Sequence, residues 1–120
     1  MTRTGTTLSQ GDIVLVPIPF TDLSSQKRRP VIVVSNNQYH RSTGDMLVVA
    51  MTSNPAAAPY SFAITSSDLE SGNLNRPGTV RVDKLFTLSQ GLVAKVFGRV
   101  NTAVLGRIRA VLEDLVSAKP

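Results

Sequence analysis

Apolar residues gather in short runs along this chain, with polar turn-forming segments between them. Three runs stand out, at residues 13–18 (IVLVPI), 31–34 (VIVV) and 46–51 (MLVVAM). The second and third runs lack polar alternation, which is typical of buried strands. We therefore predict strands over 13–18, 31–35 and 46–52, and we expect Pro17 and Pro19 to place the first strand at an edge of the sheet or to give it a bulge near its end.

The second half of the chain carries weaker strand signals. Residues 78–82 (GTVRV) alternate, which places Thr79 and Arg81 on one face of a strand and two valines on the other. Asp83 follows in a position to cap a short helical turn. Two further β-like segments, 60–64 and 92–100, are separated from this strand by a turn-rich connection over 65–75 on one side and by the expected helical turn on the other.

The end of the chain predicts one long helix, capped by Asn101 or Thr102. Its apolar residues recur at intervals of three and four: Val104, Leu105, Ile108, Val111, Leu112 and Leu115. Residues 36–44 contain turn formers and one expected helical turn. The pattern as a whole predicts a mainly β fold, a curled antiparallel sheet closed by a C-terminal α-helix.

The length of 120 residues fits one domain, which we expect over residues 11–118 after a flexible polar leader over 1–10. The first residues contain no apolar signal-peptide core, and no window approaches the roughly 18 apolar residues of a membrane span. We expect no membrane association and a cytoplasmic location.

Composition narrows the chemistry that this domain can perform. The chain has no cysteine, so disulfides, thiol nucleophiles and cysteine-ligated zinc are excluded, and His40 is its one histidine. We expect no metal and no cofactor. Thirteen Lys and Arg against eight Asp and Glu give a net charge of +5, which favours an anionic partner such as nucleic acid or an acidic protein segment.

Three cations, Lys27, Arg28 and Arg29, end at a proline where the second apolar run begins. Pro30 restricts the residue before it to extended backbone, so Arg29 is held more firmly than an ordinary surface arginine. A fixed charge at the end of a buried strand suits a binding site. The structural alternative is a solvated hairpin tip.

Two other groups could carry chemistry. Thr52 and Ser53 are hydroxyls at a strand terminus. Arg81 and Asp83 point to the same side of an extended strand and can present a guanidinium beside a carboxylate. The structural alternative for this pair is a turn cap and surface ion pair, worth less than about 1 kcal/mol.

Taken in order, these segments resemble the MazF/PemK (Kid) toxins of bacterial toxin–antitoxin systems. The resemblance rests on GDIVLVPIPF, KRRPVIVVSNN, VVAMTSNP, VRVDKLFTL and KVFGRVN before the terminal helix, and it covers about residues 11–116. It implies an SH3-like barrel of the CcdB/PemK type, a homodimer, and a metal-independent endoribonuclease that cuts single-stranded RNA. It also implies an acidic antitoxin as inhibitor.

The resemblance also assigns roles to single residues. Arg29 matches the catalytic arginine of the family and Thr52 the catalytic threonine, while Arg81 and Asp83 match an arginine and an aspartate of the PemK/Kid branch. Phe62 matches a phenylalanine that contacts substrate. The residues expected to bind RNA are Lys27, Arg28, Ser53, Phe62, Arg81 and Lys84.

These residue types can support RNA cleavage by the 2′-hydroxyl. Arg29 can stabilise the charge that builds on the phosphate, because guanidinium binds phosphate through two parallel hydrogen bonds. Thr52 can hold a nonbridging oxygen or orient the attacking hydroxyl. Asp83 is the candidate general base, and its burial beside Arg81 decides its protonation state. Whether Asp83 or another group accepts the proton stays open.

Two departures from the family keep an alternative open. Lys84 stands where the family usually has glutamine, and the loop over 20–27 is shorter than usual and contains no histidine. His40 lies outside the motif blocks, where a lone histidine is usually solvated or locally bonded. The alternative is a member of the same fold that only binds, either CcdB-like through a protein partner or as a small nucleic-acid-binding domain.

Overall fold

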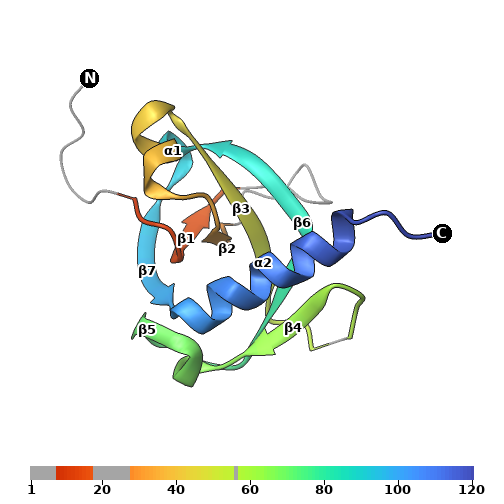
Figure 1. Ribbon diagram of the computed structural model, residues 1–120. Helices are drawn as coiled ribbons and strands as arrows, with labels where there is room; N and C mark the ends of the chain where they lie inside the picture. The colour runs from red at the N-terminus through yellow and green to blue at the C-terminus, as the bar shows by residue number, and fades with distance from the viewer. Residues whose placement is uncertain (1–7, 18–27, 56) are drawn as a thin grey trace.

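The computed structural model describes residues 8–17, 28–55 and 57–120, and in these the chain forms one curled antiparallel sheet crossed by a C-terminal helix (Figure 1). The strands follow the order β4-β6-β3-β2-β1-β7-β5 across the sheet. Their bounds are β1 Asp12–Val16, β2 Arg29–Val33, β3 Asp45–Thr52, β4 Ser61–Ile64, β5 Leu69–Gly72, β6 Gly78–Ser89 and β7 Lys95–Val100, with helices α1 Asn37–Ser42 and α2 Thr102–Val116. The predicted mainly β fold with a C-terminal helix is confirmed.

Strand β2 lies at the centre of the sheet, between β1 and β3, as its apolar sequence predicts. Val31, Ile32 and Val33 are fully buried. Successive side chains of a strand point to opposite faces, so the unbroken run means that both faces are covered. Ile32 belongs to one apolar cluster, while Val31 and Val33 belong to another.

The two clusters lie on opposite faces of the sheet. The first is packed beneath α2 and includes Val49, Phe62, Val80, Val104 and Ile108. The second is formed by β1, β2, β3 and the ends of β6 and β7, where the sheet curls over itself. The central strands β1, β2 and β3 therefore have one face toward α2 and one face toward the inside of the curl.

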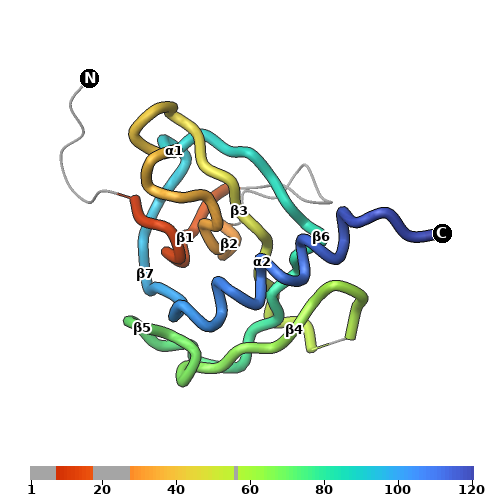
Figure 2. Tube along the Cα trace, in the orientation of Figure 1, coloured from red at the N-terminus to blue at the C-terminus, as the bar shows by residue number. Residues whose placement is uncertain are grey.

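Helix α2 begins at its predicted cap. The Asn101 side chain accepts a hydrogen bond of 2.9 Å from the Val104 backbone, and the Asn101 N–H donates to the carbonyl of Asp68. A cap of this kind contributes about 1 kcal/mol. Val104 and Ile108 are buried against the sheet, and the chain after α2 extends away from the body (Figure 2).

The prediction that Asp83 caps a helical turn was wrong. Strand β6 continues from Gly78 to Ser89 because β3 offers a long ladder that pairs Leu85 with Val49 and Ser89 with Asp45. The ladder is interrupted where Ala50 pairs with Arg81, so residues 82–84 form a bulge without partners on β3. Such bulges bend a strand and change the direction of its side chains.

Other boundaries also differ from the predictions. The connection over 65–75 contains the 3-10 turn Ser66–Asp68 and the edge strand β5, which pairs with β7 in a way that its polar sequence did not indicate. Strand β7 begins at Lys95 rather than at residue 92, and β2 includes Arg29 and Pro30 but ends before Val34. Strand β1 ends before Pro17 and lies between β2 and β7 rather than at an edge, and its irregular register is at Ile13 and Val14, near its start.

Two predicted segments fall on residues that the structure does not describe: most of the leader over 1–10 and all of the loop over 20–27. The single domain over 11–118 stays a prediction. Within the described part of the chain, no helix combines the length and the apolar character needed to cross a membrane.

His40 is buried on α1, with 8% of its surface exposed. Its Nε2 lies 2.6 Å from the Ser35 hydroxyl oxygen, which also accepts a hydrogen bond from the Leu47 backbone. Ser35 can therefore donate its proton only to a neutral imidazole. Burial lowers the pKa of His40, and the opposing effects of the Leu8 backbone and the Asp12 carboxylate are smaller.

We expect the free energy of unfolding to fall as pH drops below about 6.5, the ordinary pKa of histidine. The unfolded chain takes up a proton there that folded His40 resists, so the slope attributable to His40 reaches up to about 1.4 kcal/mol per pH unit. Urea unfolding at several pH values, compared between the wild type and His40→Gln, measures this slope. Equal slopes in the two proteins would contradict it.

Candidate active site

The predicted site residues belong to three neighbouring strands whose register brings them together. Strand β3 pairs Ala50 with Val31 on β2 and with Arg81 on β6. Continuing the β2–β3 register by two residues places Arg29 opposite Thr52. Paired residues of an antiparallel sheet share a face, so Arg29, Thr52 and Arg81 all point to the side away from α2.

A pocket of about 260 Å³ lies at this place, and we call it the arginine pocket. Three of its lining side chains are cationic, and none of the described residues that line it is acidic. The pocket therefore offers concentrated positive charge to an anion. Its lining residues are Arg29, Ala50, Met51, Thr52, Asn54, Arg81 and Lys84.

Arg29 reaches the pocket from the first position of β2, where it pairs with Val16 of β1. It is half-buried, and Pro30 behind it pairs with Leu15 in the same ladder. The backbone of Arg29 is held by a neighbouring strand and by the proline that follows. The side chain that carries the guanidinium therefore starts from a fixed backbone position.

Thr52 ends β3 on the opposite side of the pocket. Its hydroxyl oxygen accepts a hydrogen bond of 3.1 Å from the Asn54 backbone N–H, so its own proton can be donated to a ligand. The Thr79 hydroxyl donates to the Asn54 carbonyl at 3.2 Å and holds the same turn from β6. The turn after Thr52 is thus fixed from two sides.

Arg81 and Asp83 form a bidentate ion pair, with distances of 2.9 Å from Nε to Oδ1 and 2.8 Å from Nη2 to Oδ2. Their side chains are 27% and 31% exposed. The hydrogen bonds to Asp83 raise the pKa of Arg81, and those from Arg81 lower the pKa of Asp83. Asp83 is therefore a carboxylate at neutral pH, and both of its oxygens are turned to Arg81.

A comparison of the sequence with protein families identifies the family of this chain. Residues 9–116 match the family described as PemK-like, MazF-like toxins of type II toxin-antitoxin systems. The chain belongs to this toxin family. A comparison with curated protein sequences gave no match.

Solved structures show that the toxin also shares its fold with known proteins. An endoribonuclease in complex with its cognate antitoxin, from a Mycobacterial species, is 23% identical with a TM-score of 0.73, over 95% of this chain and 100% of that one. A chain of the MazE–MazF complex (Form-II) of Deinococcus radiodurans is 22% identical with a TM-score of 0.72, over 96% and 100%. The Mycobacterium tuberculosis toxin MazF-mt6 is 14% identical with a TM-score of 0.68, over 86% and 93%.

Several predicted site residues of the toxin lie outside the arginine pocket. Asp83 does not line the pocket but forms an ion pair with Arg81, which does. Ser53 lines a neighbouring hollow. Arg28 is exposed just before β2 and does not line the pocket. Lys27 lies outside the described residues. Lys84, in contrast, enters the pocket from the β6 bulge, although its sequence context gave no geometric reason for it.

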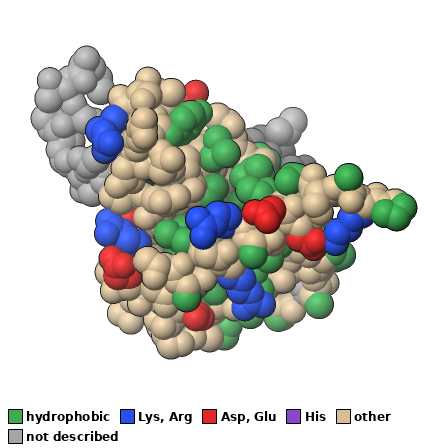
Figure 3. Space-filling view, viewed as in Figure 1, with side chains coloured by type: hydrophobic (Ala, Val, Ile, Leu, Met, Phe, Trp, Pro, Cys, Tyr) green, Lys and Arg blue, Asp and Glu red, His purple; other side chains and the backbone are tan. Residues whose placement is uncertain are grey.

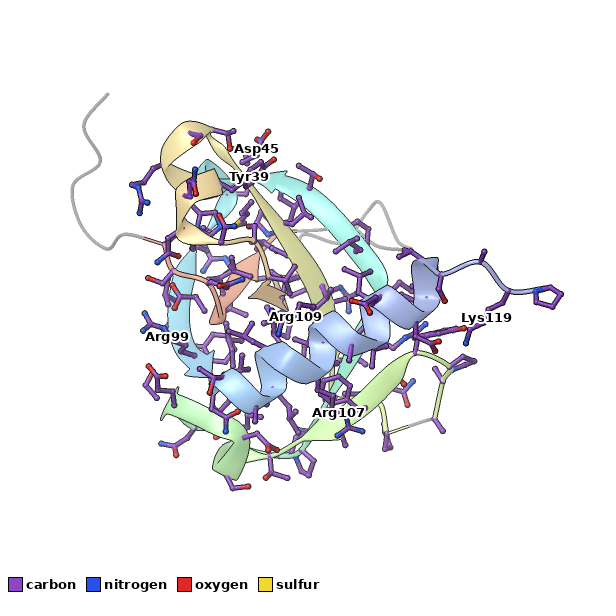
Figure 4. The ribbon with its side chains drawn as sticks, viewed as in Figure 1. Tyr39, Asp45, Arg99, Arg107, Arg109 and Lys119 are labelled. Atoms are coloured by element: carbon purple, nitrogen blue, oxygen red, sulfur yellow. The ribbon has the colours of Figure 1, made fainter. Side chains whose placement is uncertain are left out.

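Phe62 is not brought to the arginine pocket at all. It lies in the apolar cluster beneath α2, on the other face of the sheet, and is 6% exposed. The guanidinium carbon of Arg107 lies 4.1 Å from the centre of its ring, and Figure 4 shows Arg107 on the side of α2 that faces β4. The ring is occupied by this cation–π contact and by core packing, so we leave Phe62 out of the proposed site.

Asn54 is the polar residue of the arginine pocket that sequence reasoning missed. Its position two residues after Thr52, before Pro55, marks a turn that closes back over the strand end. Among the described residues there is no group of three His, Asp or Glu side chains close enough to hold a metal ion.

The charge in the arginine pocket predicts binding of a phosphate anion. We expect inorganic pyrophosphate to raise the melting temperature of the toxin by several degrees, because ligand at about ten times its Kd contributes about 1.4 kcal/mol. Arg29→Ala should abolish the rise, whereas Arg41→Ala on exposed α1 should leave it intact. Thermal unfolding against NaCl of equal ionic strength measures the effect. A rise that survives Arg29→Ala would place the anion elsewhere.

Proposed function

We propose that this toxin is an endoribonuclease that cleaves single-stranded RNA by attack of the 2′-hydroxyl, without a metal ion. The observation that carries the proposal is the convergence of Arg29, Thr52, Arg81 and Lys84 on one pocket. Phosphate of RNA is the anion that such a set of cations and a hydroxyl donor suits. The toxin family and the similar structures of endoribonucleases support the same activity.

The proposed reaction moves charge onto the phosphate. The 2′-oxygen bonds to phosphorus as its proton leaves to a base, the P–O5′ bond breaks, and the 5′-oxygen takes a proton. The products are a 2′,3′-cyclic phosphate and a 5′-hydroxyl. In this scheme Arg29 stabilises the charge on the nonbridging oxygens and can hydrogen-bond the leaving oxygen. The Thr52 hydroxyl donates a hydrogen bond to a nonbridging oxygen. Lys84 and Arg81 add to the positive field.

Asp83 can serve in one of two ways. As a carboxylate with a lowered pKa it can accept a proton, but the same lowered pKa makes it a weak base. Both of its oxygens hold Arg81, and it does not line the pocket. We therefore propose that Asp83 positions Arg81, and that the proton acceptor is another group or water.

The proposed partners are RNA, an acidic antitoxin and a second copy of the toxin. The net charge of +5 and the cationic pocket favour an acidic inhibitor, and two of the similar structures contain an antitoxin.

A hollow of about 380 Å³ between α2 and the sheet, lined by Leu47, Leu105 and Leu112 among others, supports a homodimer. Figure 3 shows hydrophobic side chains gathered on this face.

The purified toxin should cut single-stranded RNA in the presence of EDTA and leave 2′,3′-cyclic phosphate ends. Loss of a donor aimed at transition-state charge costs roughly 10²–10³ in rate, so we expect Arg29→Ala and Thr52→Ala to lower kcat/KM by that factor. Thr52→Ser keeps the hydroxyl and should retain most of the activity. Gel assays with end mapping on a varied RNA pool measure both.

Two controls separate site effects from general ones. Thr87→Ala removes an exposed hydroxyl from β6 at a position outside the arginine pocket. Arg41→Ala removes a charge equal to that of Arg29 from α1, the helix that follows β2. Both should cleave like the wild type. The absence of cleavage by the wild type across the pool would rule out the activity. Growth inhibition that persists when Arg29 and Thr52 are both alanine would favour a toxin that only binds.

The positioning role of Asp83 predicts that its effect depends on Arg81. Asp83→Asn should lower kcat/KM about tenfold, and this loss should nearly vanish in an Arg81→Ala background, as a double-mutant cycle detects. Because the pKa of Asp83 is lowered, wild-type activity should show no acid limb from Asp83 above about pH 4. A loss of 10²–10⁴ that persists without Arg81 would identify Asp83 as the base instead.

A further inference from the structure

A second hollow, of about 210 Å³, adjoins the arginine pocket at the end of β3. It lies where the turn over residues 74–77 comes close to the start of β2 and to β7, and residues 51 and 52 line both spaces. Gly78 permits this close approach, since a Cβ there would lie 3.2 Å from the Met51 sulfur. Met51, Leu74 and Phe97 belong to the cluster beneath α2, whereas Arg29 and Thr52 point to the other face, so the two spaces lie on opposite faces of the sheet and share the end of β3 as their common wall.

The two spaces differ in chemistry. The arginine pocket is cationic, whereas the second hollow has apolar surfaces from Pro30, Met51 and the half-buried ring of Phe97. Besides Thr52, its polar side chains are Ser53, Asn75 and Arg76, and none of the described residues that line it is acidic. Apolar and aromatic surfaces with hydrogen-bonding groups at the edge are the surroundings in which proteins bind unstacked bases of single-stranded RNA.

Size and position favour a base over a larger ligand. Pockets for drug-sized molecules occupy about 300–1,000 Å³, and the second hollow is smaller. A phosphate held between Arg29 and Thr52 would be joined through one sugar to whatever enters the space on the other side of Thr52. A negatively charged protein segment would find only Arg76 there as a charged partner among the described lining residues.

We propose that the second hollow is a base-binding subsite for the nucleotide next to the phosphate that is cut. Asn75 and Arg76 determine which base is accepted, since the amide both donates and accepts hydrogen bonds and the guanidinium donates several. Phe97 supplies the surface on which the base packs. The proposal rests on the proposed ribonuclease function and adds to it the residues that select sequence.

Binding can be measured without cleavage. The chain contains no tryptophan, so Phe97→Trp provides a single fluorescent reporter inside the hollow. The probes are dinucleoside monophosphates carrying each of the four bases, with a 2′-deoxy sugar that prevents cleavage. We expect saturable quenching by one or two of the bases, at least tenfold weaker with an abasic dinucleotide and with Arg76→Ala added. Equal quenching by the abasic probe, or quenching by poly-glutamate alone, would overturn the proposal.

Cleavage specificity gives a second measurement that does not depend on the tryptophan variant. Base frequencies around the cuts in a random RNA pool are compared among the wild type, Asn75→Ala, Arg76→Ala and the control Arg41→Ala. We expect Asn75→Ala and Arg76→Ala to weaken the preference roughly tenfold at one position beside the cut, the size of effect of one or two hydrogen bonds, and to raise KM more than they lower kcat. The control should match the wild type.

The outcomes separate the two proposals. Unchanged base frequencies in both variants, or a uniform loss of rate at every sequence, would overturn the base subsite and leave the ribonuclease in place. Base-selective quenching by a protein that cuts no RNA would overturn the ribonuclease and leave the second hollow as a base-binding site alone.

Discussion

The register between β2, β3 and β6 is the constraint on which the site depends. Side chains alternate between faces, so a slip of one residue would turn Arg29 or Thr52 toward α2 and bury a polar group in the apolar cluster there. The valines and isoleucines of β2 and β3 prevent the slip because each fits only one of two different clusters. Core packing on both faces thus fixes the register that places Arg29 beside Thr52.

The bulge in β6 modifies this regular ladder at one place, and that place is the site. Residues 82–84 leave β3, yet the Val82 N–H still bonds the Tyr60 carbonyl next to β4 at 3.0 Å, so the strand stays anchored while it bends. As a result, Asp83 turns back to Arg81 and Lys84 enters the arginine pocket. The bulge also explains how one short segment contributes two cations to a pocket and keeps its carboxylate outside the lining.

The positive charge of the arginine pocket results from the position of Asp83 outside its lining. Arg81 is held by Asp83 in a fixed bidentate geometry, while Arg29 reaches the pocket from β2 and Lys84 from the bulge of β6. Because none of the described lining residues is acidic, the lining of the pocket carries a net positive charge. A fully exposed ion pair would add little to stability, and this half-exposed pair is better understood as a means of orienting a guanidinium. The second hollow has Arg76 as the one charged side chain among its described lining residues, and with the arginine pocket it provides the separate places that we propose for base and phosphate.

Local pattern alone determined the buried strands, the cap and apolar face of α2, and the pairing of Arg81 with Asp83, because these depend on periodicity and near neighbours. The order of the motif blocks further pointed to Arg29 and Thr52 as partners. Tertiary structure decided what sequence could not: the continuation of β6 past Asp83, the edge strand β5, the burial of Phe62 under Arg107, and the entry of Lys84 and Asn54 into the pocket. Each of these depends on the partner that a distant segment supplies, a ladder on β3, an edge on β7 or a helix over β4, and such long-range pairings leave no periodic signal in the chain itself.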